Sequence, residues 1–442
     1  MSTSQFESTM RQPRLLTVAP FSSLVDSKVT IRATGMKANS PVTIRSFVQQ
    51  ETRRSGFVKF EAHAHYIADD RGVVSVPDQM SLGGTYTGAE PMGLFWSMVP
   101  SPGQRFGIRF IVKDVTEPMV VHLSLHRGHL DTKKLQTAEP EATTTAERRY
   151  MGQNVERITV HSGRLRGTLF KPKGSGPFPG VIDMFGSTGG LIEIRAAMLA
   201  SRGLACYALP YFSYDDLPAS MWNLELEYFK EAVDWLCGQP FVRPGGIGMV
   251  GVSSGAQIVF AMAAHFPEKV RAVISINGCH VHTLFPLTVN GVPVPYITCD
   301  IGSMKPAPTE GAQSLFDTFK AIYDMEEDNH TIYRIENATN CQFLFITGEG
   351  DELWDSCYYA REAMKRLARH GRHNYQLLTY PGAGHLIEVL YSPVAMVVYS
   401  IAIGSVVDHG GTIKDTAKAM EDSWPKMVKF LHNYCGRNNS KL

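Results

Sequence analysis

Cysteine is sparse in this chain, and its placement suggests no shared structural role. The 442 residues include seven cysteines, which are scattered and never spaced as CxxC pairs. An odd, dispersed set of this kind argues against a disulfide framework and against a thiolate metal site, and it is typical of a reduced compartment. We therefore expect a protein that is not secreted.

Long apolar runs and an excess of charge of one sign are also missing. No uninterrupted apolar stretch reaches membrane-spanning length, and no basic-then-apolar signal segment opens the chain. The 43 basic residues are balanced by 42 acidic ones, so no whole-chain field attracts nucleic acid or anionic lipid. These absences predict a soluble protein with no membrane span and no nucleic-acid partner.

What the sequence does contain is apolar material for two cores. The hydrophobic share is 44% and the charged share 19%, as in folded soluble proteins, and the length exceeds that of one ordinary domain. Short alternating runs broken by Gly, Pro, Asn and Asp fill the first part of the chain, at residues 28–32, 42–45, 58–61, 107–112 and 119–125. This spacing predicts strands and, without helix-length segments, an all-β, immunoglobulin-like sandwich over residues 15–135.

The domain boundary is expected in a polar segment. Residues 136–150 are rich in Thr and Glu with few large apolar groups, which is typical of an exposed linker. We expect residues 1–14 to be a flexible N-terminus, residues 151–435 to form the second domain and residues 436–442 to be a tail.

Strands and helices alternate in the second domain. Strands are expected at residues 155–160, 165–170, 180–185, 205–209, 247–250, 273–276, 343–346 and 376–380, and helices at 191–202, 221–236, from 255, at 357–370 and at 416–433. Alternation of this kind predicts a mostly parallel sheet with flanking helices, the α/β class. Residues 278–340, rich in proline, are read as an insertion with a short helix at 312–323, and Pro425 should kink or break the last helix.

A serine between glycines is the clearest catalytic motif. Ser253 lies at the centre of the sequence GVSSG at residues 251–255, after a strand-like run and before a helix-like one. A serine hydroxyl is a poor nucleophile at neutral pH, so it needs a neighbouring base and a tight turn that exposes it. The spacing puts Ser253 at the apex of that turn and the backbone N–H of Ser254 where an oxyanion donor is needed. Ser253 is the predicted nucleophile, with a chance match in a glycine-rich chain as the alternative.

An acid and a histidine follow the serine in the order Ser, Asp, His that is typical of such hydrolases. Asp351 comes shortly after the strand-like residues 343–346, and His385 follows the next strand on a glycine-rich loop. Imidazole is the natural base near neutral pH, and parallel strands bring their carboxyl ends to one edge. We predict Asp351 as the acid and His385 as the base. The competing carboxylates nearby are Glu349, Glu352 and Asp355.

The second oxyanion donor is expected in the loop after an early strand. Residues 185–190 read FGSTGG, and we assign the backbone N–H of Gly186 or Ser187 to the oxyanion hole. The loop lacks the GxxxxGK[ST] and GxGxxG patterns of phosphate and dinucleotide sites, so no cofactor is predicted. His280 and His282 resemble a metal pair, but no carboxylate or cysteine cluster surrounds them, and no metal is predicted.

The chain finishes with Ser440, Lys441 and Leu442. A C-terminal SKL tripeptide is the address read by the peroxisomal import receptor. We therefore expect a peroxisomal protein with that receptor as a partner, the alternative being a chance polar tail.

Longer strings of sequence resemble the acyl-CoA thioesterases that share their fold with bile acid-CoA:amino acid N-acyltransferase. The resemblance covers most of the chain and rests on AHAHY at 62–66, SLGGTY at 81–86, PMGLFWS at 91–97, DMFG at 183–186, residues 211–218, the serine motif, residues 348–356, Tyr380-Pro381 and Gly384-His385. It implies an α/β-hydrolase fold, a fatty acyl-CoA substrate hydrolysed to free acid and CoA, and a triad at Ser253, Asp351 and His385.

The residue at position 253 bears on the acyl acceptor. The acyltransferase branch of the family carries cysteine at the nucleophile position, whereas serine favours transfer to water. The resemblance therefore implies a thioesterase, with conjugation of the acyl group to glycine or taurine as the alternative. Ser254, where related elbows usually carry lysine, and the poorly matching residues 278–340 leave the acyl-length preference open.

Overall fold

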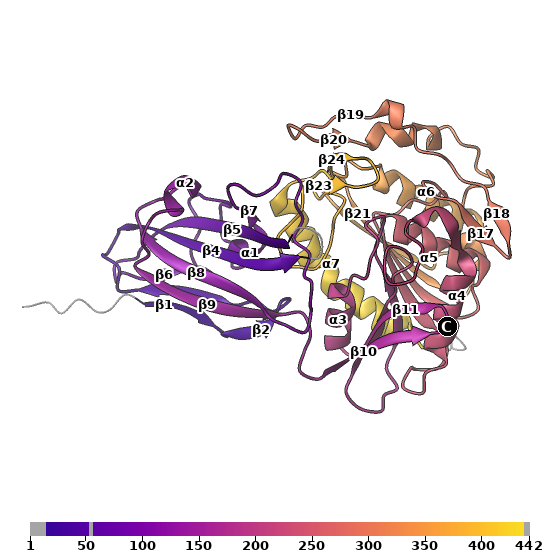
Figure 1. The fold of residues 1–442 in the computed structure, drawn as a ribbon, viewed down its shortest axis with the longest axis horizontal. Coiled ribbons are helices and arrows are strands. Elements are labelled where there is room, and N and C mark those ends of the chain that lie inside the picture. The colour runs from indigo at the N-terminus through magenta and orange to yellow at the C-terminus, as the bar shows by residue number, and fades with distance from the viewer. Residues whose placement is uncertain (1–14, 53–55, 437–442) are drawn as a thin grey trace, which may run out of the picture. The chain divides into compact units, whose positions relative to one another are not determined.

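A computed structural model describes residues 15–52 and 56–436, and the chain divides into two compact units (Figure 1). The first comprises Met1–Gln104, Glu117–Arg149 and Tyr391–Pro393, and the second comprises Arg105–Thr116, Tyr150–Leu390 and Val394–Leu442. The expected flexible N-terminus at 1–14 and tail residues 437–442 lie outside the described residues. The second unit thus takes a segment from the region expected to belong only to the first.

The first unit is built from strands, as expected. One sheet has the order β2-β9-β8-β4-β5-β7 and the other the order β1-β3-β6. The long central strands β4 (Pro41–Thr52) and β5 (Gly56–Ile67) pair antiparallel. Residues 44–49 of β4 alternate between more and less buried side chains, whereas residues 60–64 of β5 are all buried. Its only described helices, of four residues each, are α1 (Gly93–Trp96) and α2 (Thr132–Leu135). The remaining strands are β1 (Leu15–Ala19), β2 (Ser22–Leu24), β3 (Thr30–Thr34), β6 (Val74–Ser75), β7 (Val99–Pro100), β8 (Met119–Arg127) and β9 (Ala142–Arg149).

The linker expected at residues 136–150 is wrong, because β9 occupies most of it and pairs with β8 and β2. Thr has a high strand propensity, so a Thr-rich run fits a half-exposed strand as well as a linker. Arg148 is fully buried in β9, where its guanidinium donates to the carbonyl oxygens of Val25 (2.7 Å) and Ser27 (2.6 Å). Composition gave no sign of these distant acceptors.

The second unit contains an eight-stranded sheet of order β10-β11-β13-β12-β15-β16-β21-β22. The predicted hairpin of β10 (Val155–Ser162) and β11 (Leu165–Pro172) is confirmed, and β11 pairs antiparallel with β13 (Ala205–Ala208). All later neighbours are parallel, from β13 and β12 (Gly180–Met184) through β15 (Ile247–Val252), β16 (Val270–Ile276) and β21 (Gln342–Gly348) to β22 (Tyr375–Tyr380). Strands β12 and β15 are buried along their whole length, as sheet strands covered on both faces are.

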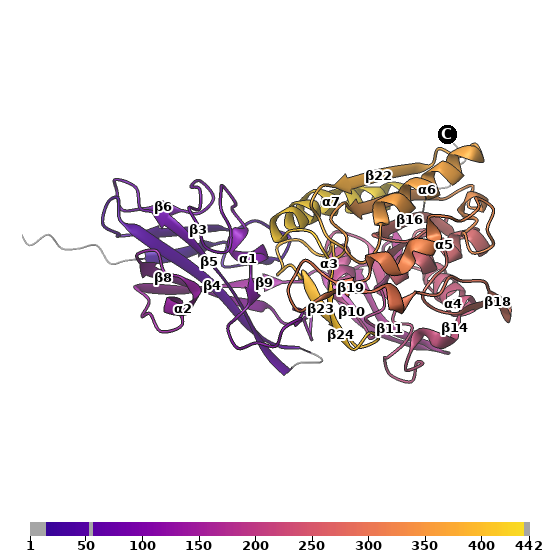
Figure 2. The same cartoon turned by 90° about the horizontal axis from the view of Figure 1, so that it is seen from above.

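Five helices pack on this sheet (Figures 1 and 2): α3 (Ile194–Ser201), α4 (Leu226–Cys237), α5 (Ser254–His265), α6 (Ser356–Arg369) and α7 (Ile413–Tyr434). Helix α5 is buried over almost its whole length against β15 and β16. The predicted α/β-hydrolase architecture is therefore present. Between β16 and β21 lie only short elements, among them β17 (Leu287–Val289), β18 (Val292–Val294), β19 (Lys305–Pro306) and β20 (Gln313–Ser314).

Three local expectations are wrong in whole or in part. The strand expected at residues 107–112 has no regular structure and belongs to the second unit, where the N–H of Tyr399 donates to the carbonyl of Gly107 (2.9 Å). The helix expected at 312–323 is a 3-10 helix at Phe316–Ile322, preceded by β20, which pairs with β24 (Ser405–Asp408). Of the kink or break expected at Pro425, the break does not occur, because α7 runs through this residue. Long-range pairing and packing of the helix overrode the local pattern in these segments.

Candidate active site

Ser253 occupies the sharp turn between β15 and α5 that its sequence predicts. Its backbone has φ 56° and ψ −124°, a region that favours glycine and that other residues enter under strain. The flanking glycines are sterically required, since a Cβ on Gly251 would lie 2.3 Å from the carbonyl oxygen of Gly255. A Cβ on Gly255 would lie 2.6 Å from the carbonyl oxygen of Phe185. The local sequence thus forms a nucleophile elbow and presses it against the loop after β12.

Asp351 and His385 are joined by a hydrogen bond. The Nδ1 atom of His385 lies 2.8 Å from Oδ2 of Asp351, and both side chains are about 2% exposed. The other carboxylate oxygen of Asp351 accepts from the N–H groups of Leu353 (2.9 Å) and Trp354 (3.3 Å). An Nδ1–H donated to the carboxylate leaves Nε2 as the basic atom of the neutral imidazole. This pair has the arrangement of a base and the group that orients it.

The three competing carboxylates have other surroundings. Glu349 is exposed, Glu352 accepts from the hydroxyl of Ser314 (3.0 Å), and Asp355 caps α6 by accepting from the N–H of Tyr358 (2.8 Å). Asp351 is therefore the carboxylate of this loop that the structure brings to His385.

Ser253 lies at the same edge of the sheet but is not hydrogen-bonded to His385. Nε2 of His385 is buried and has no partner among the described residues, and the Ser253 residue is 6% exposed. The N–H of Ser253 donates to the carbonyl of Ile276 (3.0 Å). The next residue, Asn277, binds the loop that carries His385. Catalytic hydrogen bonds are often long before substrate binds, so this geometry is compatible with a serine and base that meet in the complex.

Asn277, which sequence reasoning missed, connects the loops that carry the acid and the histidine. Its Nδ2 donates to the carbonyl oxygens of Gly384 (3.1 Å) and His385 (2.7 Å). Its Oδ1 accepts from the N–H of Gly348 (2.8 Å) and the hydroxyl of Ser356 (3.0 Å). Its position directly after the strand at 270–276 was the one available signal.

The predicted oxyanion loop lies against Ser253. A Cβ added to Gly186 would be 2.9 Å from Cβ of Ser253 and 3.4 Å from its Oγ. Ser254 is fully buried at the first position of α5, so its backbone N–H belongs to the helix N-terminus beside the elbow. Both predicted donor segments therefore flank the serine, and Ser187 follows Gly186 on the same loop.

Two further residues were assigned no role from sequence: His409, which contacts His385, and Arg109, which lies near His409. The N–H of His385 donates to the carbonyl of His409 (2.7 Å), and burial, with the nearby His385 and Arg109, lowers the pKa of His409 to about 3. Arg109 forms an ion pair with Glu388 and stacks over the ring of Phe185 with its guanidinium 4.6 Å from the ring centre. Arg109 belongs to the segment that the second unit takes from the earlier part of the chain.

His280 and His282 are core residues. Both are buried, and burial lowers the pKa of His280 to about 3 and that of His282 to about 4, so both rings are neutral near pH 7. No group of His, Cys, Asp and Glu that could hold a metal ion occurs among residues 15–52 and 56–436. Within the same ranges no helix is long and apolar enough to cross a membrane.

The mostly parallel sheet, the strained serine elbow and the Asp–His pair at its carboxyl edge define an enzyme of the α/β-hydrolase class. The family model described as "Acyl-CoA thioester hydrolase/BAAT N-terminal region" matches residues 26–162, and "BAAT / Acyl-CoA thioester hydrolase C terminal" matches residues 224–437. The chain belongs to this acyl-CoA thioester hydrolase/BAAT family.

Curated relatives match almost the whole chain. Bile acid-CoA:amino acid N-acyltransferase of Homo sapiens is 39% identical over 95% of this chain and 97% of its own length. Acyl-coenzyme A amino acid N-acyltransferase 2 of Mus musculus is 38% identical over 97% of this chain and 99% of its own. Acyl-coenzyme A thioesterase 1 of Homo sapiens is 36% identical over 94% of this chain and 96% of its own length. Both branches are thus similar to the chain to nearly the same degree.

Proposed function

We propose that this protein is an acyl-CoA thioesterase that hydrolyses fatty acyl-CoA to free acid and CoA through Ser253, Asp351 and His385. The observation that carries the proposal is the buried Asp351–His385 hydrogen bond of 2.8 Å at the sheet edge where Ser253 occupies its elbow. The thioesterase relatives support the substrate class. The serine at position 253 is what distinguishes hydrolysis from conjugation.

The residues account for both halves of the reaction. Nε2 of His385 takes the hydroxyl proton as Oγ of Ser253 bonds to the thioester carbonyl carbon, and the N–H groups of Ser254 and of Gly186 or Ser187 hold the oxyanion. Collapse of this intermediate breaks the C–S bond, and the CoA thiolate leaves and takes up the proton from His385. Water then gives a proton to Nε2 and its oxygen to the acyl carbon, which releases the acid and restores the Ser253 hydroxyl.

Amino acid N-acyltransfer is the second candidate, favoured by the 38–39% identity to acyltransferases of that description. It differs from hydrolysis only in the second half, where an amine replaces water as the attacking group. A thioester acyl-enzyme is more reactive toward amines than the oxygen ester formed on serine, so Ser253 favours water as the acceptor.

The direct test incubates the purified protein with acyl-CoA thioesters of short, long, branched and bile-acid type, each with and without glycine or taurine. Thiol release measures turnover, and mass spectrometry of the acyl product separates free acid from conjugate. We expect free acid to dominate even with the amine present. Mostly conjugate would replace the thioesterase by the acyltransferase, and no thiol release from any substrate would overturn both.

Substitutions at the proposed triad test the assignment of roles. We expect Ser253→Ala and His385→Ala to fold normally and to lose turnover by at least about 1,000-fold, and Asp351→Asn to lose at least about 100-fold. The exposed Ser162→Ala is the matched serine control and should keep the starting activity. Turnover near the starting level in Ser253→Ala would remove the nucleophile assignment.

We further propose a peroxisomal location, supported by the terminal residues Ser440, Lys441 and Leu442, which lie outside the described residues. The import receptor would be the partner that reads this tripeptide. A fluorescent protein fused to the N-terminus should coincide with a peroxisomal marker, and deletion of the last three residues should disperse it. An unchanged distribution after the deletion would contradict the proposal.

A further inference from the structure

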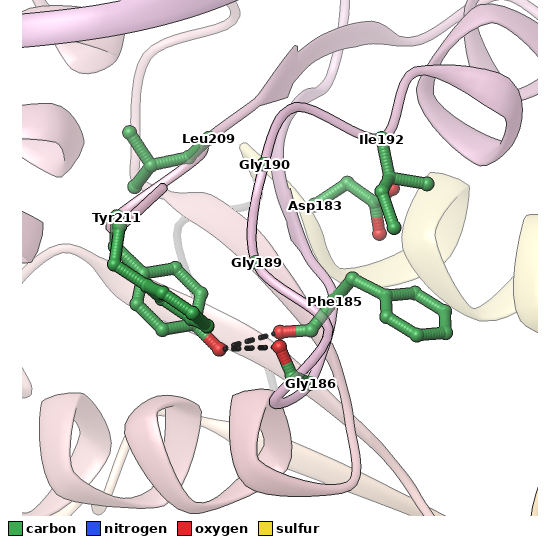
Figure 3. A pocket seen from close by; sticks show the side chains of 9 residues that line it. Asp183, Phe185, Gly186, Gly189, Gly190, Ile192, Leu209 and Tyr211 are labelled. Atoms are coloured by element: carbon green, nitrogen blue, oxygen red, sulfur yellow. Dashed lines mark hydrogen bonds between the residues drawn. The ribbon is translucent and has the colours of Figure 1, made fainter. Parts of the chain in front are cut away.

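Tyr211, which has no part in the proposed acyl transfer, hydrogen-bonds to the predicted oxyanion loop. This side chain follows β13, and its hydroxyl donates to the carbonyl oxygen of Phe185 at 2.7 Å and also lies 3.1 Å from that of Gly186 (Figure 3). The residue is 5% exposed. One phenol hydrogen is thus shared by two consecutive carbonyls of the loop.

Holding these two oxygens fixes the direction of the two proposed donors. In a planar trans peptide the C=O of one residue and the N–H of the next point in opposite directions. The carbonyl of Phe185 therefore orients the N–H of Gly186, and the carbonyl of Gly186 orients the N–H of Ser187. Both N–H groups are turned away from Tyr211, on a backbone that lies beside Ser253.

Two glycines and a small void leave this loop conformational freedom, although the N–H of Gly190 also holds it by donating to the carbonyl of Phe212 (3.0 Å). Gly189 and Gly190 both have positive φ, at 66° and 77°, and glycine can rotate more freely than other residues. A void of about 10 Å³, bounded in part by Gly186, Gly189 and Tyr211, leaves the loop incompletely packed on that side (Figure 3). That volume holds about one water molecule.

Tyr211 itself is rigid. Its ring packs edge-on against Phe212 and Phe229, with ring centres 5.2 and 5.5 Å apart. Burial raises the pKa of its phenol above the ordinary value, so the hydroxyl keeps its proton and remains a donor across the working pH range. A fixed donor on a packed ring is suited to hold the glycine-rich loop in one orientation.

We propose that Tyr211 is a positioning residue that orients the oxyanion hole through the carbonyls of Phe185 and Gly186. It does not touch the substrate. The inference rests on the proposed function to the extent that Ser253 must be the nucleophile. Loss of the hydroxyl lets the Phe185–Gly186 and Gly186–Ser187 peptides rotate, so the donors are no longer aligned where charge develops in the transition state.

The test replaces Tyr211 by Phe, which keeps the ring and removes only the hydroxyl. We expect kcat for acyl-CoA to fall about 10- to 100-fold, with KM changed by less than about three-fold. This loss should not exceed the loss of kcat caused by removing one oxyanion-hole donor completely. The pH profile of kcat/KM should stay in place, because Asp351 and His385 are untouched. A purely structural role would not separate kcat from KM in this way.

Tyr228→Phe is the matched control. Its hydroxyl donates to the carbonyl of Pro210 (2.7 Å), and its ring packs on the same Phe229, but it does not contact the oxyanion loop. We expect both variants to lose similar stability and only Tyr211→Phe to lose kcat. Equal loss of kcat in both variants, or no loss in Tyr211→Phe, would overturn the proposal.

Two further measurements separate this inference from an unstable variant and from a failure of the proposed function. Incorporation of p-aminophenylalanine at position 211 restores a hydrogen-bond donor at the end of the ring. If Tyr211→Phe is impaired or unstable, this variant should recover most of the lost kcat. A variant that does not recover kcat would contradict the inference. A fluorophosphonate that labels Ser253 also needs the oxyanion hole and requires no CoA substrate. Slower labelling of Tyr211→Phe than of Tyr228→Phe would support the inference even if wild type releases no CoA, whereas an unlabelled Ser253 in wild type would end it.

Discussion

At the residue scale, the site depends on a few side chains with several simultaneous contacts. Asn277 is the clearest of them, because its one amide joins the loop after β21 to the loop that carries His385. Its backbone has φ 46°, a conformation that Asn tolerates and Ala does not. The sequence identified the residues of the proposed chemistry, but not the amide that holds them.

Replacement of Asn277 should show this dependence. We expect Asn277→Ala to lower the free energy of unfolding by about 2 to 4 kcal/mol, because four buried hydrogen-bonding groups lose their partner and the backbone is strained. Asn277→Gly accepts the backbone and loses only the contacts, so it should be more stable than Asn277→Ala. Both variants should lose kcat, because the loops that carry Asp351 and His385 are no longer joined. Chemical denaturation and steady-state kinetics measure both, and full activity in Asn277→Gly would contradict the assigned contact.

Ser253 offers a second residue-scale test, on backbone strain. Ala and Gly at this position both lack the hydroxyl, so both variants should be inactive. Gly adopts φ 56° without strain. We expect Ser253→Gly to be more stable than Ser253→Ala by about 1 kcal/mol in urea denaturation. Equal stability would show that the elbow stores no measurable strain.

At the scale of elements, packing decides where local sequence is equivocal. Pro425 predicts a kinked or broken helix, yet α7 extends unbroken from Ile413 to Tyr434 and buries Trp424, Met427 and Leu431. The packed face compensates for the hydrogen bond that a proline cannot donate. Conversely, the polar run at 142–149 forms a strand because β8 offers it a partner.

Replacement of Pro425 should show how much the proline lowers the free energy of unfolding. Pro425 is exposed, so Pro425→Ala restores a backbone donor without changing the core. We expect an increase of about 1 to 3 kcal/mol in the free energy of unfolding and a higher Tm. The exposed Lys429→Ala in the same helix should change stability by less than about 0.5 kcal/mol. A destabilised Pro425→Ala would mean that the ring itself is needed.

At the scale of the whole molecule, the chain order of the two units is interleaved. Residues 105–116 belong to the second unit although they lie between strands of the first, and they supply Arg109 to Glu388 and Phe185. A cut at the apparent boundary after residue 149 therefore removes part of the second unit. Sequence composition alone placed this segment in the first domain.

A fragment that starts at residue 150 lacks residues 105–116 and therefore tests whether the second unit needs them. Without Arg109, Glu388 loses its ion pair and the Phe185 ring loses the guanidinium stacked on it. We therefore expect the fragment to have a lower Tm and weaker turnover than the full chain. In the full chain Arg109→Ala should lose about 2 kcal/mol of stability for the same reason. A fragment as stable and active as the full chain would show that residues 105–116 are dispensable.

Buried neutral histidines should make the whole molecule sensitive to acid. The pKa values of His280 and His409 are lowered to about 3 and that of His282 to about 4 by burial. Between pH 6.5 and 4 the unfolded chain binds protons that the folded protein does not, so stability is present above pH 6.5 and falls as the pH falls. We expect about 1 to 2 kcal/mol lost per histidine between pH 7 and pH 5, and a shallower slope in His280→Phe. An unchanged slope would contradict a neutral His280.

The sequence by itself determined the two fold classes and the order of the second unit's strands along the chain, and it indicated Ser253, Asp351 and His385 as the proposed triad. These are local signals, since hydrophobic periodicity, glycine spacing and distance from a strand end are all written in short segments. Only the tertiary structure decided that Asp351 and not a neighbouring carboxylate meets His385, that Asn277 and Tyr211 hydrogen-bond to the loops around Ser253 and His385, and that residues 105–116 join the second unit. Each of these depends on contacts between segments distant in sequence, which no local pattern encodes.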